Sequence, residues 1–164
     1  MNNPRAFSYR QGELLARALN KAGVDYLFIG KSGAIILGYP DTTQDVDIYP
    51  RKDIENGKRI IKALVKLGFS LDEKTKEAII KGKDFIQVKS GPFDIDLVFA
   101  PDGFEDYDEV LARSVKIRQF PVANIKDIIK SKEAAKRERD LRDLPLLREF
   151  AKTLQRGKDL LRRK

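Results

Sequence analysis

The sequence contains no cysteine and no histidine. Without cysteine, the chain can form neither a disulfide bond nor a thiolate metal site. Without histidine, it can use neither a Ser-His-Asp nor a Cys-His catalytic arrangement, and it has no imidazole to offer a metal. A metal ion in this protein must therefore be a hard cation bound by oxygen atoms, such as Mg²⁺, Mn²⁺ or Ca²⁺.

Long hydrophobic runs are also absent. No stretch approaches the roughly 18 consecutive apolar residues of a membrane-spanning helix, and the first residues, MNNPRAFSYRQ, lack the apolar core of a signal peptide. We therefore expect a cytoplasmic location and no membrane partner. A chain of 164 residues is long enough for one domain with a buried core. We expect that domain to span 1–164, with its core over about 24–147 and a basic helical tail over 124–164.

Positive charge is concentrated in that tail. The net charge of the chain is +8, and residues 126–164 hold 14 Lys and Arg against 7 Asp and Glu. A tail of this kind could attract a polyanion such as RNA, DNA or a nucleoside triphosphate. An equally good alternative is a solvated helical face with mixed charges.

The order of hydrophobic patterns and turn residues predicts a mixed structure. We expect helices over 8–22, 32–38, 53–68, 104–114 and 124–136, a short one over 73–80, and a last one from about 139 that Pro145 breaks or restarts. Strands are expected over 25–30, 45–49, 84–89, 93–99 and 115–122, with 84–99 forming a hairpin. The fold class is α+β (mixed α/β), a mixed sheet flanked by helices with a helical C-terminus.

The stretch Gly30-Lys31-Ser32 resembles the end of a phosphate-binding P-loop, because it follows one apolar run and leads into another. The P-loop pattern begins with another glycine five positions before the Gly-Lys pair, but in this sequence that position is occupied by Asp25. The residues between, Tyr-Leu-Phe-Ile, are bulky and have the composition of a strand interior. The P-loop interpretation is therefore rejected.

Two Asp-x-Asp pairs carry the strongest chemical signal. In Asp45-Val46-Asp47 the two carboxylates would lie on one face of a strand, because residues two apart in a strand point the same way. Asp94-Ile95-Asp96 repeats the pattern. If these strands are neighbours, their carboxylates converge, and such a cluster can hold the two metal ions of a phosphoryl-transfer site. The alternative is two exposed Asp pairs on strand edges, which is less favoured because Asp is a poor strand former.

At these residues the sequence resembles the nucleotidyltransferase superfamily related to DNA polymerase beta. It is most similar to the minimal prokaryotic branch that includes the abortive-infection nucleotidyltransferase toxins. The resemblance covers about 24–147 and has three parts: the run IGKSGAIILGYPDTTQDVDIY, the strand Ile-Asp-Leu-Val at 95–98, and the tail IIKSKEAAKRERDLRD at 128–143. In the first run the matching residues are Gly30, Gly38, Tyr39, Pro40, Thr43, Asp45 and Asp47.

The resemblance implies a site and a reaction. Asp45, Asp47 and Asp96 would be catalytic and would bind Mg²⁺ or Mn²⁺, with Asp94 as the alternative third carboxylate. The residues implied to bind the nucleotide are Gly30, Lys31, Ser32, Gly33, Thr43 and Lys132. The turn from Gly30 to Gly33 would bind the β- and γ-phosphates through backbone N–H groups, and Ser32 would add a hydroxyl donor. Lys31 stands where the family has Gly or Ser, so its side chain could either crowd the phosphates or pair with them. Arg137, Asp140 and Asp143 are expected to be structural, with Asp140 or Asp143 tying the last helix to the sheet.

The implied function is transfer of NMP from an NTP to an acceptor hydroxyl, with release of pyrophosphate. The acceptor could be RNA (including tRNA), a protein or a small molecule, and a protein partner or a homodimer could complete the acceptor site. One alternative is a non-catalytic nucleotide- or RNA-binding module, for example in a toxin–antitoxin pair. Another is a Mg²⁺-dependent nuclease that uses the same carboxylates.

Overall fold

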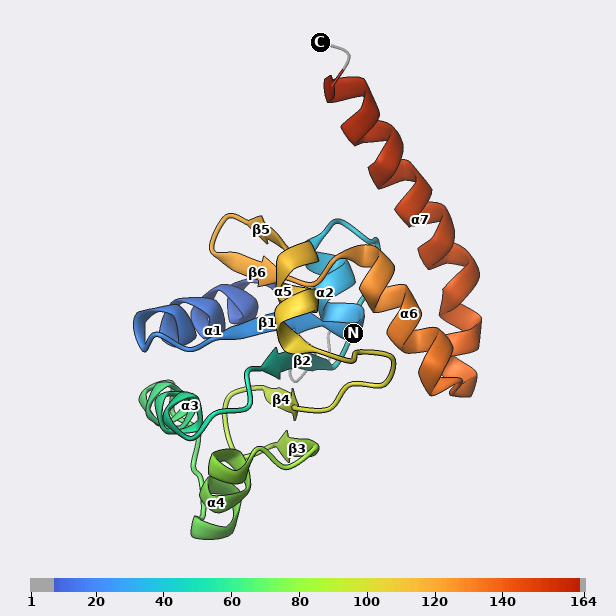
Figure 1. Ribbon diagram of the computed structural model, residues 1–164. Helices are drawn as coiled ribbons and strands as arrows, with labels where there is room; N and C mark the ends of the chain where they lie inside the picture. Colours follow the sequence, from blue (N-terminus) through green and yellow to red (C-terminus); the bar gives the residue numbers. More distant parts are fainter. Residues whose placement is uncertain (1–7, 163–164) are drawn as a thin grey trace.

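A computed structural model describes residues 8–162 of the chain, and within this range the fold is α+β, with seven helices and six strands (Figure 1). In chain order the elements are α1 (Tyr9–Lys21), β1 (Tyr26–Ile29), α2 (Gly30–Ile36), β2 (Asp45–Pro50), α3 (Ile54–Lys66), α4 (Glu73–Lys81), β3 (Phe85–Val88), β4 (Asp94–Val98), α5 (Tyr107–Arg113), β5 (Val115–Ile117), β6 (Phe120–Val122), α6 (Ile125–Ala135) and α7 (Glu138–Arg162).

The strands form one mixed sheet in the order β3-β4-β2-β1-β6-β5. β2 runs parallel to β4, and β1 runs parallel to β6, while the remaining neighbours are antiparallel. The parallel register sets Asp45 beside Asp94 and Asp47 beside Asp96. The two Asp-x-Asp pairs therefore lie next to each other on one face of the sheet, as the sequence predicted.

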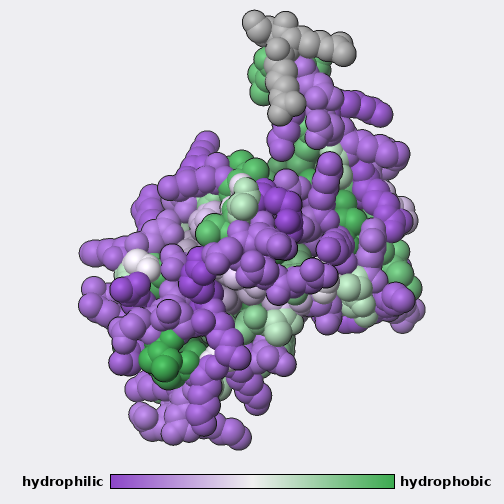
Figure 2. All heavy atoms as spheres, viewed as in Figure 1, coloured by the Kyte–Doolittle hydropathy of each residue, from purple (hydrophilic) through white to green (hydrophobic). Residues whose placement is uncertain are grey.

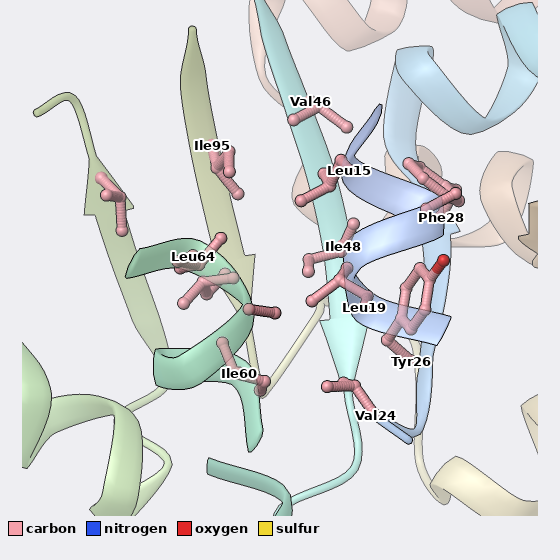
Figure 3. Close-up of a cluster of buried hydrophobic side chains, with 14 of the residues drawn as sticks. Leu15, Leu19, Val24, Tyr26, Phe28, Val46, Ile48, Ile60, Leu64 and Ile95 are labelled. Carbon is pink, nitrogen blue, oxygen red and sulfur yellow. The ribbon is translucent and has the colours of Figure 1, made fainter. Parts of the chain in front are cut away.

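The opposite face of the sheet carries the main hydrophobic core. Val46 and Ile48 of β2 alternate with the aspartates and are fully buried, and Ile95 of β4 does the same. These side chains pack against α1 and α3, which lie side by side over the sheet (Figure 3). This apolar packing determines which face of β2 and β4 points toward the core, so it also fixes the direction in which the carboxylates point.

The carboxylate face is covered only at the β1 end. There α5 and α6 pack on Leu27, Ile29 and Tyr49 through Tyr107, Val110 and Ile128. A third cluster joins α2 and α6 to α7 through residues that include Ala34, Ile129, Leu144 and Leu147. Beyond Leu154 the described part of α7 no longer contributes to this cluster, and the helix projects from the body (Figure 1). Hydrophilic side chains cover most of the face seen in Figure 2.

The predicted elements are largely confirmed, with two corrections. The segment 115–122 was expected to be one strand, but it forms a hairpin, β5 and β6, with Arg118 at a positive φ of 55°. Pro145 was expected to break or restart the last helix, but α7 continues through it. Pro145 and Leu141, whose carbonyl loses its helical partner, are both exposed, so water can satisfy that oxygen.

None of the helices within residues 8–162 is long and apolar enough to cross a membrane. The expectation about a signal peptide rests partly on residues 1–7, which lie outside the described residues, as do 163 and 164 of the basic tail.

Asn56 holds the ends of β1 and β2 to α3. Its buried side chain accepts a hydrogen bond from the Asp25 backbone N–H (2.8 Å) and donates to the carbonyls of Asp25 (2.9 Å) and Arg51 (2.8 Å). We expect Asn56→Ala to lower the free energy of unfolding by about 3 kcal/mol, since it leaves several buried backbone groups without partners. Urea unfolding followed by circular dichroism measures this loss.

Lys62→Ala is the matched control, because Lys62 is exposed on the same helix. It should change the free energy of unfolding by less than about 0.5 kcal/mol. Similar losses for the two variants would show that Asn56 does not anchor the strands.

Candidate functional site

A cavity of about 470 Å³ opens over the uncovered carboxylate face. Its floor is made by β2 and β4, one side by the β1–α2 junction, another by β3, and the remaining wall by α6 and the start of α7. The predicted site residues that line it are Gly30, Lys31, Thr43, Asp45, Asp47, Asp96 and Lys132. Asp96 therefore borders the cavity, whereas Asp94 is not among the lining residues.

The carboxyl groups of Asp47 and Asp96 lie within hydrogen-bonding reach of each other. Burial raises the pKa of Asp47 well above its usual range, and the negative charges of Asp96 and Asp45 raise it further. Burial likewise raises the pKa of Asp96, and Asp45 adds to the rise. The fold therefore concentrates negative charge at the cavity floor at an energetic cost.

The carboxylate cluster suits a hard divalent cation in its chemistry. Its donors are all oxygens, and the buried Oδ1 of Asp96 has no hydrogen-bond partner. In the described part of the chain, however, no three acidic side chains are already arranged as a closed ligand set. Asp47 and Asp96 would hold such an ion, and Asp45, at the half-buried start of β2, would complete the set.

Gly30 gives the Asp47 carboxylate its space. Its φ is +62°, and a Cβ at this position would overlap Oδ2 of Asp47 and approach its Cγ to 3.2 Å. Only glycine combines this backbone conformation with so close an approach. Gly30 thus leaves room for the Asp47 carboxylate, while its role in nucleotide binding stays a prediction.

Ser32 does not face the cavity, which corrects the expectation that its hydroxyl binds a phosphate. The side chain is fully buried. Its hydroxyl donates to the Ile29 carbonyl (3.1 Å) and accepts from the Asp47 backbone N–H (3.0 Å). Because its proton is already used, Ser32 instead ties the start of α2 to the backbone of a site residue.

Gly33 requires a similar correction, because it was expected to belong to a phosphate-binding turn. It lies inside α2, where a Cβ would come within 3.1 Å of the Phe28 carbonyl oxygen and 3.2 Å of Ile128 Cδ1. It is also absent from the cavity lining. Gly33 therefore allows α2 to pack closely on β1 and α6.

The ammonium group of Lys31 lies between two carboxylates. Its Nζ is 3.1 Å from Asp41 Oδ2 and 3.2 Å from Asp143 Oδ2. Partial burial lowers the pKa of Lys31, but the hydrogen bonds to Asp41 and Asp143 outweigh this and raise it overall. Lys31 borders the cavity and links α2 to the loop before β2 and to α7. Asp143 thus ties the last helix to α2, not directly to a strand.

Positive charge gathers on the α6–α7 side of the cavity. Lys132 is nearly buried there, and its Nζ lies 3.4 Å from Asp140 Oδ1. Arg137 donates from Nε to Asp140 Oδ2 (2.7 Å), and the exposed Arg139 also lines the cavity. The positive charge of Lys132 acts on Asp47, whose raised pKa it partly opposes after the larger effects of burial and Asp96. A cationic end thus faces the carboxylate floor.

Sequence reasoning missed the wall formed by β3 and treated Arg137 as purely structural. Phe85 and Gln87 line the cavity, and so does Arg139. Their positions depend on the pairing of β3 with β4, which sets Gln87 opposite Asp96. The only sequence signal was the alternation Phe85-Ile86-Gln87-Val88, in which an aromatic residue stands on the polar face.

No protein-family model matches the chain, and no curated protein sequence is similar to it. Among solved structures it is similar to the crystal structure of JHP933 from Helicobacter pylori, with 17% sequence identity and a TM-score of 0.48. The match covers 84% of this chain and 66% of JHP933, slightly less than two thirds of that protein. At this level of similarity we draw no conclusion from JHP933 about this chain.

The close approach of Gly30 to Asp47 can be tested against a second glycine. Gly68 also has a positive φ (+101°), but a Cβ there would meet nothing within 4 Å. Gly68→Ala should cost about 1 kcal/mol of unfolding free energy from backbone strain alone. We expect Gly30→Ala to cost at least about 1 kcal/mol more, because the methyl group displaces the Asp47 carboxylate.

The excess loss should disappear in a background that carries Asp47→Ala, because the displaced group is then absent. Thermal and urea unfolding of Gly30→Ala, Gly68→Ala, Asp47→Ala and the double variant Gly30→Ala/Asp47→Ala measures these losses. An excess that persists without the Asp47 carboxylate would contradict the steric explanation.

Proposed function

We propose that this protein is a Mg²⁺- or Mn²⁺-dependent nucleotidyltransferase that moves NMP from an NTP to an acceptor hydroxyl. The observation that supports this most strongly is the convergence of Asp45, Asp47 and Asp96 at the floor of a cavity whose α6–α7 wall is cationic. Neither the carboxylate cluster nor the cationic wall is specific for this activity by itself. Together they offer complementary places for metal ions and for a polyphosphate.

The carboxylates would hold the divalent cation, which when bound would neutralise triphosphate charge and orient the reacting phosphorus. The phosphates themselves need cations of the protein. Lys132, Arg137 and Arg139 are the groups on the cavity wall that can meet them. An NTP would thus lie between the carboxylate floor and the start of α7, beside Gly30 and Thr43.

In the proposed reaction, the acceptor hydroxyl oxygen forms a bond to the α-phosphorus. The bond from that phosphorus to the bridging oxygen of the β-phosphate breaks, and pyrophosphate leaves with the electron pair. The hydroxyl proton passes to the Asp96 carboxylate.

A non-catalytic nucleotide- or RNA-binding module is the second candidate, and the internal ion pairs favour it. Lys31 is held by Asp41 and Asp143, and Lys132 is held by Asp140. If these pairs stay closed, the cations that a triphosphate needs are already neutralised, and the site could bind without turnover. A role in a toxin–antitoxin pair, a protein partner or homodimer, and a cytoplasmic location all stay predictions.

Labelled transfer separates the two candidates. We expect the wild-type chain, with Mg²⁺, α-labelled NTPs and total tRNA as first acceptor, to transfer label. Asp45→Asn and Asp96→Asn should reduce the rate at least about 100-fold, because each removes a charge that stabilises the transition state. Asp94→Asn is the matched control: Asp94 lies on the same strand as Asp96 but does not line the cavity, and its rate should stay within about threefold of wild type.

Equal losses for Asp94→Asn and Asp96→Asn would refute the assignment of the third carboxylate. If no acceptor in a cell lysate takes label, yet Mg²⁺-NTP raises the melting temperature, the binding module replaces the enzyme. Absence of any NTP-dependent shift would contradict the enzyme and a nucleotide-binding module, and would leave a module that binds RNA alone.

A further inference from the structure

We propose that the β3 wall of the cavity binds the unpaired 3′-terminal nucleotide of a single-stranded RNA, with its base stacked on Phe85. This inference rests on the proposed nucleotidyltransferase function and names the acceptor of the same site. The α6–α7 end of the cavity would bind the NTP, and the β3 end would bind the acceptor RNA.

The ends of the cavity differ in charge and chemistry. The α6–α7 end presents three cations, Lys132, Arg137 and Arg139, together with Asp143, while the β3 end presents Phe85, Gln87 and the carboxylate of Asp84. The β3 end can receive a base, whose amino groups donate to carboxylate and amide oxygens. β3 is one of the two edge strands of the sheet (Figure 1).

Phe85 is unusual in its exposure. It is 52% exposed, and of the large exposed hydrophobic side chains in the described part of the chain it is the one that borders the cavity. Single exposed hydrophobic residues are common on protein surfaces. An aromatic ring beside an otherwise polar cavity is instead what a stacking platform for an unpaired base requires.

Phe85, Gln87 and Lys89 form a row on one face. They alternate with the buried Ile86 and Val88, so their side chains point to the carboxylate side of the sheet. Successive members of such a row are about 7 Å apart. The row offers an aromatic ring for a base, an amide for its edge and a cation for a phosphate of the strand.

This row of side chains also lies beside Asp96. Gln87 pairs with Asp96 across the strands. Lys89 directly follows β3 and continues its alternation on this face. A nucleotide stacked on Phe85 would therefore have its sugar hydroxyls next to Asp96, the group proposed to take the proton.

A peptide added to the free edge of β3 fits these residues less well. Strand addition uses the backbone at the edge, whereas Phe85 and Gln87 project from the face. β3 is also only four residues long and is flanked by the exposed lysines Lys83 and Lys89, which disfavour pairing with another strand. Unpaired 3′ ends are common in RNA, while those of DNA mostly lie in duplexes, so we assign RNA.

Binding of a short, 5′-labelled single-stranded RNA to the full chain, measured by fluorescence anisotropy, tests the inference without turnover. Phe85→Ala should weaken binding at least about fivefold, since base stacking on an aromatic contributes about 1–3 kcal/mol. Phe85→Trp should keep the affinity within about twofold, and Phe85→Leu should not restore it. Ile117→Ala is the control, because Ile117 is an exposed apolar residue on the other edge strand, β5.

The affinity for Mg²⁺-NTP, measured on the same variants, separates the two reactants. An unchanged NTP dissociation constant in Phe85→Ala, together with weakened RNA binding, supports the assignment. A change in NTP affinity alone would overturn it, because the ring would then serve the nucleotide donor. Two other results would also overturn it. One is an equal loss of affinity of Phe85→Ala for an RNA duplex that has no overhang, and the other is tighter binding of single-stranded DNA than of single-stranded RNA.

The proposed function can fail separately. Its failure appears as loss of Mg²⁺-NTP binding or of labelled transfer, whereas the RNA affinity of Phe85→Ala is measured without NTP. RNA affinity that does not depend on Phe85 would reject the inference and leave the assignment of Asp45 and Asp96 untouched.

Discussion

The parallel pairing of β2 with β4 is the constraint on which the site depends. It brings Asp47 beside Asp96, and the apolar side chains that alternate with them leave the carboxylates only one direction in which to point. Like charges held so close are unfavourable, as the raised pKa of Asp47 indicates, first because the group is buried and then because Asp96 is near. The hydrophobic core beneath the sheet stabilises an arrangement that the carboxylates alone would not adopt.

Residues around these carboxylates support their positions. Gly30 leaves room for the Asp47 side chain, and Ser32 holds the Asp47 backbone. On the opposite wall, Asp140 and Asp143 engage Lys132 and Lys31. These ion pairs hold the start of α7 against α6 and α2 beside the cavity.

Much of the fold could be predicted because the signals that define it are local. Ser8, Asp53 and Asn124 cap the helices expected after them. The failures are cases in which a local rule was overruled. Pro145 stays within α7 because its neighbourhood is exposed to water, and the segment 115–122 turns at Arg118 without a glycine. In the same way, the glycines and hydroxyl near Gly30 look like a phosphate-binding turn, but Ser32 and Gly33 face the interior.

The sequence by itself determined that any metal here must be bound by oxygen and that each Asp-x-Asp pair would share one face of a strand. The first follows from composition and the second from the two-residue period of a strand. Only the tertiary structure decided that Asp96 lines the cavity and Asp94 does not, that Lys31 pairs with Asp143, and that Phe85 stands opposite the cationic wall. Strand pairing and ion pairing join residues far apart in the chain, so no local pattern records them.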